Sequence, residues 1–222
     1  MTLAGRHALV TGGGRGIGRA VAAALTGAGA AVTVVGRTEA VLSEAVSSGD
    51  AGGYFVADVT DDRALRGGIE RAVAARGAVD ILVANAGGAE SAPFAKADPE
   101  LFRRMFELNV MGAVHATRAV LGGMIARGFG RIVAIGSTAS LKGYAYVSAY
   151  CAAKHAVVGL VRALAIETAT TGVTVNAVCP GYTDTELVRA SVERHGALLH
   201  HISPPAIASV VPVTAAASGE QR

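Results

Sequence analysis

Short apolar runs alternate with longer mixed segments along the first 180 residues of the chain. Each apolar run is bounded by glycine, aspartate or another turn-forming residue, which is typical of strands. The pattern predicts six strands, at 7–10, 31–35, 54–57, 80–84, 131–135 and 173–178. The segments between them have helical spacing and predict helices at 16–28, 39–47, from the capping residues Thr60 and Asp61 to about 76, from Asp98 and Pro99 onward, and at 148–168.

Continuous apolar strands separated by helices indicate a parallel sheet that is covered on both faces. The fold class is therefore α/β, a doubly wound, Rossmann-like parallel sheet in a single domain. Ligands of such sheets bind beyond the carboxyl ends of the strands. Five notable residues follow predicted strand ends, namely Gly12, Gly36, Asp58, Asn85 and Ser137.

Composition narrows the function classes. The chain has 222 residues, of which 51% are hydrophobic and 17% charged, and its net charge is +3. The basic residues are scattered, which argues against nucleic acid as a partner. Cys151 and Cys179 lie far apart and have no metal-type spacing, so we expect no metal site and a cytoplasmic, reducing location. No apolar leader opens the chain, and three prolines make 202–219 a poor spanning helix, so we expect no membrane partner.

Two motifs carry candidate chemistry. Tyr150 and Lys154 are four residues apart, so on a helix they share one face. There the ammonium is expected to favour the phenolate and to lower the tyrosine pKa from its usual value of about 10. Ser137 precedes this pair by thirteen residues. Taken singly, each residue has a structural alternative: Ser137 as a turn residue, Tyr150 at a core edge, and Lys154 reaching solvent.

A glycine-rich turn, 11–18, follows the first predicted strand and opens the first predicted helix. Gly12, Gly16 and Gly18 allow a tight turn, and the helix N-terminus offers free N–H groups to a pyrophosphate. Such a turn can also be a plain connector. It does not fit the strict Gly-x-Gly-x2-Gly dinucleotide spacing.

Together these motifs resemble the short-chain dehydrogenase/reductase family, in its ketoacyl-reductase-like form of about 250 residues. The resemblance runs from about Arg6 to about Thr185. It implies hydride transfer between a nicotinamide and a ketone or secondary alcohol of a small molecule, with a 3-oxoacyl thioester as one candidate. It implies Tyr150 as general acid or base, Lys154 as its partner and ribose ligand, Ser137 as holder of the carbonyl oxygen, and Asn109 in a proton relay. Asn109 also has a bland interpretation, a bond to neighbouring backbone.

The resemblance also implies the cofactor contacts. Arg15 and Arg37 suit a 2′-phosphate, so NADP(H) is favoured and NAD(H) is the alternative. Solvated surface arginines are the other interpretation, and Glu39 is a ribose candidate that stands late in the sequence. The expected contacts are Gly12, Arg15, Gly16, Ile17, Gly18, Arg37, Asp58, Val59, Asn85, Ala86, Gly87, Tyr150, Lys154, Pro180, Gly181, Thr183 and Thr185.

The C-terminal part departs from the family pattern. We expect a dinucleotide-binding catalytic domain over 1–194 and an atypical tail over 195–222, in which 210–213 can add only a poor edge strand. The helix at 148–168 is apolar nearly all round, and in the family it meets a second subunit, so we expect a homodimer, while a tetramer depends on the tail. The competing function is a regulatory or scaffold protein that binds nucleotide without turnover.

Overall fold

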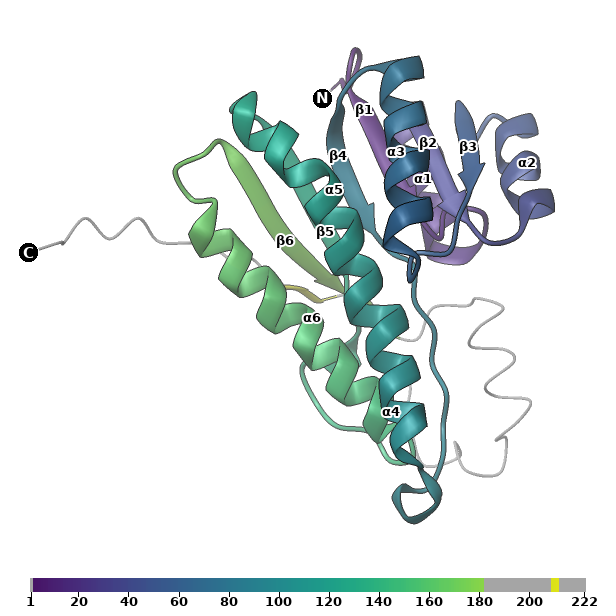
Figure 1. Cartoon of the computed structure of the whole chain (residues 1–222), viewed down its shortest axis with the longest axis vertical. Helices are drawn as coiled ribbons and strands as arrows, with labels where there is room; N and C mark the ends of the chain where they lie inside the picture. The colour runs from purple at the N-terminus through teal and green to yellow at the C-terminus, as the bar shows by residue number, and fades with distance from the viewer. Residues whose placement is uncertain (1, 182–208, 212–222) are drawn as a thin grey trace, which may run out of the picture.

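The computed structural model describes residues 2–181 and 209–211, and its described part is built around one seven-stranded sheet (Figure 1). The strand order is β3-β2-β1-β4-β5-β6-β7. The strands are β1 (His7–Thr11), β2 (Ala31–Gly36), β3 (Gly53–Val56), β4 (Val79–Ala84), β5 (Gly130–Ile135), β6 (Val173–Cys179) and β7 (Ser209–Val211). Strands β1 to β6 pair in parallel, which confirms the predicted fold class.

The last strand differs from the others. β7 runs antiparallel to β6, with Cys179 opposite Ser209 and Ala177 opposite Val211. It begins one residue before the poor edge strand expected at 210–213, and the rest of that expected strand lies outside the described residues. Part of the expected tail thus belongs to the sheet, where it covers one edge of β6.

Helices cover both faces of the sheet. Helix α1 (Gly16–Gly27) and α2 (Glu39–Ser47) bury Ala22, Leu42 and Ala45 in one apolar cluster with β1 and β2. The opposite cluster is larger and takes side chains from α3 (Asp62–Arg76), α4 (Pro99–Phe106), α5 (Gly112–Ala126) and α6 (Ser148–Glu167). In Figure 1, α5 and α6 run side by side across this second face.

Aspartate side chains cap the N-termini of two of the expected helices, α3 and α4. Asp61 is the cap of α3, because its side chain accepts a hydrogen bond from the Ala64 N–H at 2.9 Å. Thr60 is not a cap of that helix. Its N–H and hydroxyl both donate to Oδ1 of Asp58, at 3.0 and 2.9 Å. Asp98 caps α4 through the N–H of Leu101, with proline in the tolerated first position.

The helix expected from Asp98 onward is not continuous. A π-helical turn, Glu107–Met111, separates α4 from α5. Inside it, the side-chain amide of the buried Asn109 donates to the Met105 carbonyl at 2.9 Å. Such turns insert one residue into a helix and are common at functional sites. The interruption gives Asn109 a direction that a regular helix would not.

Helix α6 is, among the described residues, the one helix long and apolar enough to cross a membrane. Its apolar residues contact α4 and β6, and it carries the buried Lys154. A core helix of this length and composition passes the same test. The uncharged stretch at 202–219 lies almost wholly outside the described residues.

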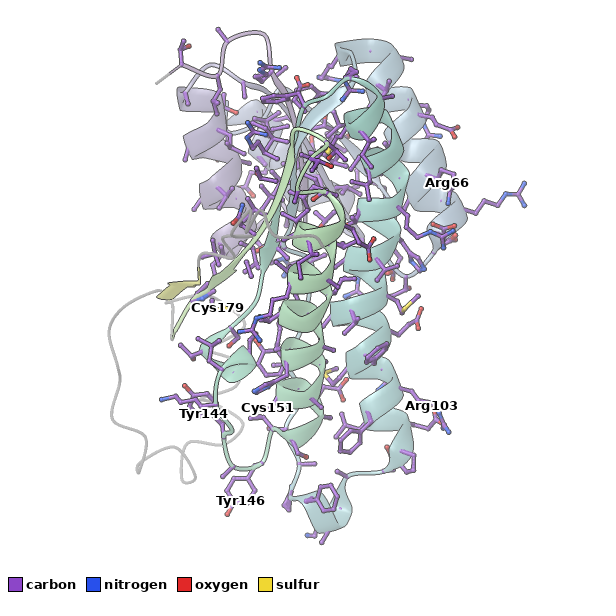
Figure 2. All side chains as sticks on the ribbon, turned by 90° about the vertical axis from the view of Figure 1, so that its left-hand side faces the viewer. Arg66, Arg103, Tyr144, Tyr146, Cys151 and Cys179 are labelled. Atoms are coloured by element: carbon purple, nitrogen blue, oxygen red, sulfur yellow. The ribbon has the colours of Figure 1, made fainter. Side chains whose placement is uncertain are left out.

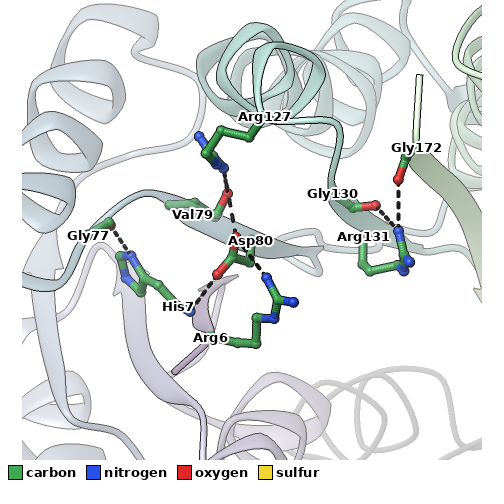
Figure 3. Close-up of polar contacts among 9 residues, drawn as sticks. All are labelled: Arg6, His7, Gly77, Val79, Asp80, Arg127, Gly130, Arg131 and Gly172. Atoms are coloured by element: carbon green, nitrogen blue, oxygen red, sulfur yellow. Dashed lines mark hydrogen bonds and ion pairs between the residues drawn. The ribbon is translucent and has the colours of Figure 1, made fainter. Parts of the chain in front are cut away.

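The amino ends of the strands hold a polar cluster around His7 and Asp80, at the edge opposite the notable glycines (Figure 3). The Asp80 carboxylate accepts from the His7 N–H at 3.3 Å and lies 3.7 Å from Arg6 Nη1. The His7 ring donates from Nδ1 to the Gly77 carbonyl at 2.7 Å, which leaves Nε2 to accept from the Thr33 hydroxyl at 2.9 Å. Both ring nitrogens thus have a partner, and burial favours the neutral form of the ring.

This neutral ring predicts a loss of stability in acid. Burial lowers the pKa of His7 below its ordinary 6.5, so the unfolded chain binds the proton more readily. The contribution is present above pH 6.5 and is lost as the pH falls through the lowered pKa. We expect the urea midpoint to fall between pH 7.5 and 5.5, and to fall less in His7→Gln. The exposed His155→Gln serves as control. An equal pH dependence in wild type and His7→Gln would contradict the assignment.

Candidate active site

The glycine turn between β1 and α1 is shaped by close approach of the backbone. Gly12 has φ +66°, a left-handed conformation that favours glycine, and a Cβ there would lie 2.9 Å from Nδ2 of Asn85. A Cβ on Gly18 would collide with the Gly12 carbonyl. The first turn of α1 therefore lies directly against the glycine turn, and its N–H groups face the space above the sheet.

Asn85 fixes this turn to the neighbouring strand. Its side-chain amide donates to the carbonyls of Thr11 and Gly12, at 3.0 and 3.2 Å. The Thr11 hydroxyl accepts from the N–H groups of Asn85 and Ala86, both at 3.0 Å. These bonds account for the Asn85 amide structurally. The Thr11 hydroxyl therefore holds the start of the loop after β4 against the glycine turn, a role that the sequence motif alone did not indicate.

One large cavity opens at the carboxyl ends of the strands. It measures about 590 Å³. Of the expected cofactor residues it is lined by Gly12, Arg15, Gly16, Ile17, Arg37, Asp58, Val59, Asn85, Ala86, Gly87, Tyr150 and Lys154. Gly18 lies behind the turn, Pro180 and Gly181 lie off the lining, and Thr183 and Thr185 fall outside the described residues.

Sequence reasoning missed several lining residues. Gly14, Val41, Leu108, Ile135 and Gly136 contribute to the wall. Two of them had a usable signal, because Ile135 is the last residue of β5 and Gly136 follows it, at the edge where ligands of such sheets bind. Val41 and Leu108 sit on helical segments and carried no such signal.

Tyr150 and Lys154 line this cavity, and Ser137 stands beside the Tyr150 hydroxyl without being part of the lining. Lys154 Nζ lies 5.8 Å from the centre of the Tyr150 ring, one helical turn away on α6. Ser137 is close enough to the Tyr150 hydroxyl to act on its pKa as a hydrogen-bond partner. Ser137 follows β5 and begins a short 3-10 turn, with its Oγ accepting from the Ala139 N–H at 3.1 Å. A strand end and a helix face thus hold three polar groups together.

The electrostatics of the pair differ from the expectation. Burial raises the pKa of the Tyr150 hydroxyl above its ordinary 10.0, opposed by its hydrogen bond with Ser137. Lys154 is buried, which lowers its pKa from 10.5 to about 8, and its Nζ donates to the Ile135 carbonyl at 2.9 Å. The predicted fall of the Tyr150 pKa is therefore wrong as a net result, because burial raises this pKa even with the Lys154 ammonium close by. Tyr150 is protonated at neutral pH and ready to donate.

Asn109 lies beside this group. Its Nδ2 donates to the Gly88 carbonyl at 2.9 Å, and its Oδ1 accepts from the Gly88 N–H at 3.3 Å. A Cβ on Gly87 would lie 2.6 Å from Asn109 Oδ1 and 3.4 Å from Lys154 Nζ. Asn109 thus lies next to Gly87, as Lys154 does. Within the described part of the chain, its side-chain amide bonds only backbone groups, which agrees with the structural alternative for this residue.

The far end of the cavity carries the charged residues. Arg37 follows β2, is 71% exposed and lies with Nη1 3.7 Å from Oδ2 of Asp58. Arg15 lines the same cavity just before α1. Glu39 is not part of the lining, and its carboxylate accepts a hydrogen bond from the Tyr54 hydroxyl at 3.1 Å. The carboxylate of this ribose candidate, at the start of α2, is therefore bonded to a side chain of β3.

The segment before α6 is joined to the turn that begins at Ser137, because the Tyr144 hydroxyl donates to Thr138 Oγ1 at 2.9 Å. Tyr144 and Tyr146 lie on it, and Figure 2 shows them at the same end of the molecule as the start of α6. The Tyr146 carbonyl accepts from the Ala92 N–H at 2.8 Å, which joins this segment to the loop after β4. Pro180 reaches the site through its carbonyl, which accepts from the Thr138 N–H at 2.9 Å.

None of the histidines and cysteines among the described residues lines the cavity. The rings of His115 and His155 bond the carbonyls of Val59 and Cys151. Cys151 and Cys179 are buried free thiols on α6 and at the end of β6 (Figure 2). No cluster of metal-binding side chains occurs within 2–181. The histidines at 195, 200 and 201 lie outside the described residues.

Comparison with known proteins gives consistent matches. The family model described as short chain dehydrogenase matches residues 6–196. An acetoacetyl-CoA reductase of Rhizobium meliloti is 44% identical over 191 residues, which cover 85% of this chain and 78% of the relative. A crystal structure of actinorhodin polyketide ketoreductase with NADPH superposes with a TM-score of 0.83 at 38% identity, covering 90% of this chain and 78% of the other. A gluconate 5-dehydrogenase from Burkholderia cenocepacia, in complex with NADP and tartrate, gives 0.81 at 37% identity, covering 88% and 78%.

Proposed function

Because this chain belongs to the short-chain dehydrogenase family, and is therefore a nicotinamide-dependent oxidoreductase of CH–OH and C=O groups, we propose that it uses NADP(H) to interconvert a ketone and a secondary alcohol. One observation carries the proposal: Tyr150 and Lys154 line the same cavity as the glycine turn, and Ser137 stands beside the Tyr150 hydroxyl. The cavity volume lies within the usual range for cofactor sites. The glycines let the start of α1 pack directly against the turn, and Gly16 and Ile17 of its first turn line the cavity, so the backbone N–H groups there fit the phosphates of a dinucleotide.

The mechanism divides the work between cofactor and protein. The bound nicotinamide supplies or accepts the hydride at the substrate carbon. In reduction, the protonated Tyr150 hydroxyl donates its proton to the carbonyl oxygen, and Ser137 holds that oxygen by a hydrogen bond. Lys154 holds its ammonium beside the Tyr150 ring, where it favours the phenolate left behind. In oxidation the same phenolate takes the proton back.

Arg37 supports NADP(H) as the cofactor. Its guanidinium stands at the end of β2, where a 2′-phosphate is bound in folds of this type, while Glu39 is bonded to Tyr54 instead. Arg15 adds a second positive charge to the cavity. Two solved structures similar to this chain contain NADPH or NADP.

Removing Arg37 is expected to weaken NADPH binding and to spare NADH. A charge-assisted hydrogen bond contributes about 1.5–3 kcal/mol, so Arg37→Ala should raise the Kd of NADPH about 10- to 100-fold. Titration of intrinsic tyrosine or cofactor fluorescence gives both constants. Arg66→Ala, which removes an exposed arginine of α3, is the control. An equal loss with both cofactors would count against a 2′-phosphate contact.

The substrate proposed is a 3-oxoacyl thioester or a related ketone. The similarity to an acetoacetyl-CoA reductase and to a polyketide ketoreductase supports this class. The test follows NADPH oxidation against a panel of ketones that includes acetoacetyl-CoA. Tight NADPH binding without turnover of any ketone would instead support the competing nucleotide-binding regulatory role.

We further propose a cytoplasmic homodimer that uses the outer side of α4 and α6. Phe106 is 45% exposed on this side and Ile166 is 71% exposed. Light scattering coupled to gel filtration gives the mass directly, and a monomer at micromolar concentration would contradict the proposal. The division into a catalytic domain over 1–194 and a tail over 195–222 also stays a proposal.

A further inference from the structure

The Asp58 carboxylate is engaged on both of its oxygens. Oδ1 accepts two hydrogen bonds from Thr60, from the N–H at 3.0 Å and from the hydroxyl at 2.9 Å. Oδ2 lies 3.7 Å from Nη1 of Arg37. Thr60 therefore fixes the plane of the carboxylate, and the free edge points at the guanidinium.

The sheet register brings these residues together. Arg37 comes directly after β2 and Asp58 comes two residues after β3, and the two strands pair with Gly36 opposite Val56. Both side chains line the cavity at its charged end. The Arg37 side chain is 71% exposed and that of Asp58 37% exposed, so solvent and an incoming anion both reach the pair.

We infer that Asp58 sets the cofactor preference through Arg37. It competes with the cofactor's 2′-phosphate for the guanidinium, so it lowers the preference of the site for the phosphorylated dinucleotide. This inference rests on the proposed role of Arg37. The competition follows from charge: a phosphate that bonds Arg37 must take the guanidinium from a fixed carboxylate and must approach that carboxylate closely. A dinucleotide with a free 2′-hydroxyl makes no such demand.

The exposure of the pair sets the size of the effect. An exposed ion pair is weak, because water screens it. Removing the Asp58 charge should therefore raise the affinity ratio of NADPH over NADH about two- to fivefold, in line with that range. We use the ratio of the two affinities because NADPH and NADH differ only in the 2′-phosphate. Any contact of Asp58 with the part that they share affects both affinities equally and cancels in the ratio.

The experiment is a double-mutant cycle on binding. Kd values for NADPH and NADH are measured in wild type, Asp58→Asn, Arg37→Ala and the double variant, together with adenosine 2′,5′-bisphosphate and 5′-AMP as probes that lack the nicotinamide. The asparagine side chain keeps an oxygen for Thr60, so Asp58→Asn preserves the local hydrogen bonds. We expect the ratio to rise in Asp58→Asn and to stay constant when the same change is made on Arg37→Ala.

The outcomes separate the two proposals. If Arg37→Ala leaves the NADPH-to-NADH affinity ratio unchanged, Arg37 does not bind the 2′-phosphate, and the inference about Asp58 fails with it. A ratio that falls in Arg37→Ala but does not rise in Asp58→Asn overturns the inference alone. A rise of equal size in both backgrounds shows that Asp58 acts without Arg37, and this also overturns it.

Discussion

Tyr150→Phe should lose turnover about 10²- to 10⁴-fold, the usual contribution of a positioned proton donor, and should keep its affinity for NADPH. Tyr150 is the group that touches the reacting oxygen in the proposed mechanism. Phenylalanine preserves the ring on α6 and removes only the hydroxyl that bonds Ser137. Single-turnover kinetics with a ketone from the panel and fluorescence titration of NADPH measure the two quantities separately.

The matched control is Tyr54→Phe. It also removes one phenol hydroxyl, which on β3 donates to Glu39 of α2 outside the cavity lining, and it should leave turnover unchanged. If Tyr150→Phe turned over at the wild-type rate, the proton would have to come from another group. The assignment of the site would then fail even if the cofactor bound as proposed.

Lys154→Met should lose most activity without losing stability. The ammonium is buried, and the fall of its pKa from 10.5 to about 8 costs the fold about 3 kcal/mol at neutral pH, at 1.36 kcal/mol per pKa unit. The unfolded chain binds more protons between these two values, so this cost is complete below pH 8 and disappears as the pH rises toward 10.5. Methionine removes this cost. It also leaves the buried Ile135 carbonyl without its donor, which destabilises the fold by about 1–3 kcal/mol.

The two contributions oppose each other, so we expect Lys154→Met to change the free energy of unfolding only slightly, although it removes a fully buried charge. Urea unfolding at pH 7 and pH 9.5 measures it, and the pH dependence over this range should flatten in the variant. Lys96→Met, on the exposed turn after β4, controls for loss of a lysine. A large destabilisation of Lys154→Met at pH 7 would mean that the ammonium has a stabilising partner that outweighs its burial.

The sequence predicted the architecture well because the apolar runs of a buried parallel sheet are continuous. The boundaries of β1, β2 and β5 agree within a residue, and the glycine turn and the tyrosine–lysine pair line the same cavity. The glycine positions were readable because each answers to a steric demand, as Gly12 does with its positive φ.

Other features depend on distant partners and had no local signal. Nothing near Tyr150 in the sequence says that burial outweighs the neighbouring lysine, because burial is set by the whole fold. The carbonyl that occupies Lys154 lies on β5, and the threonine that orients Asp58 is part of a turn that resembles a helix cap. The antiparallel direction of β7 likewise depends on where the chain returns to the sheet.

The π-helical turn at Glu107–Met111 limits how far this protein can be simplified. Deleting one residue there would let α4 and α5 merge into a regular helix, which has better local geometry. Everything beyond the deletion would rotate by about a hundred degrees, one residue's share of a 3.6-residue turn. Asn109 would then leave Gly88. Shortening the chain at this turn to raise thermal stability would thus give a more regular helix and disrupt the proposed active site.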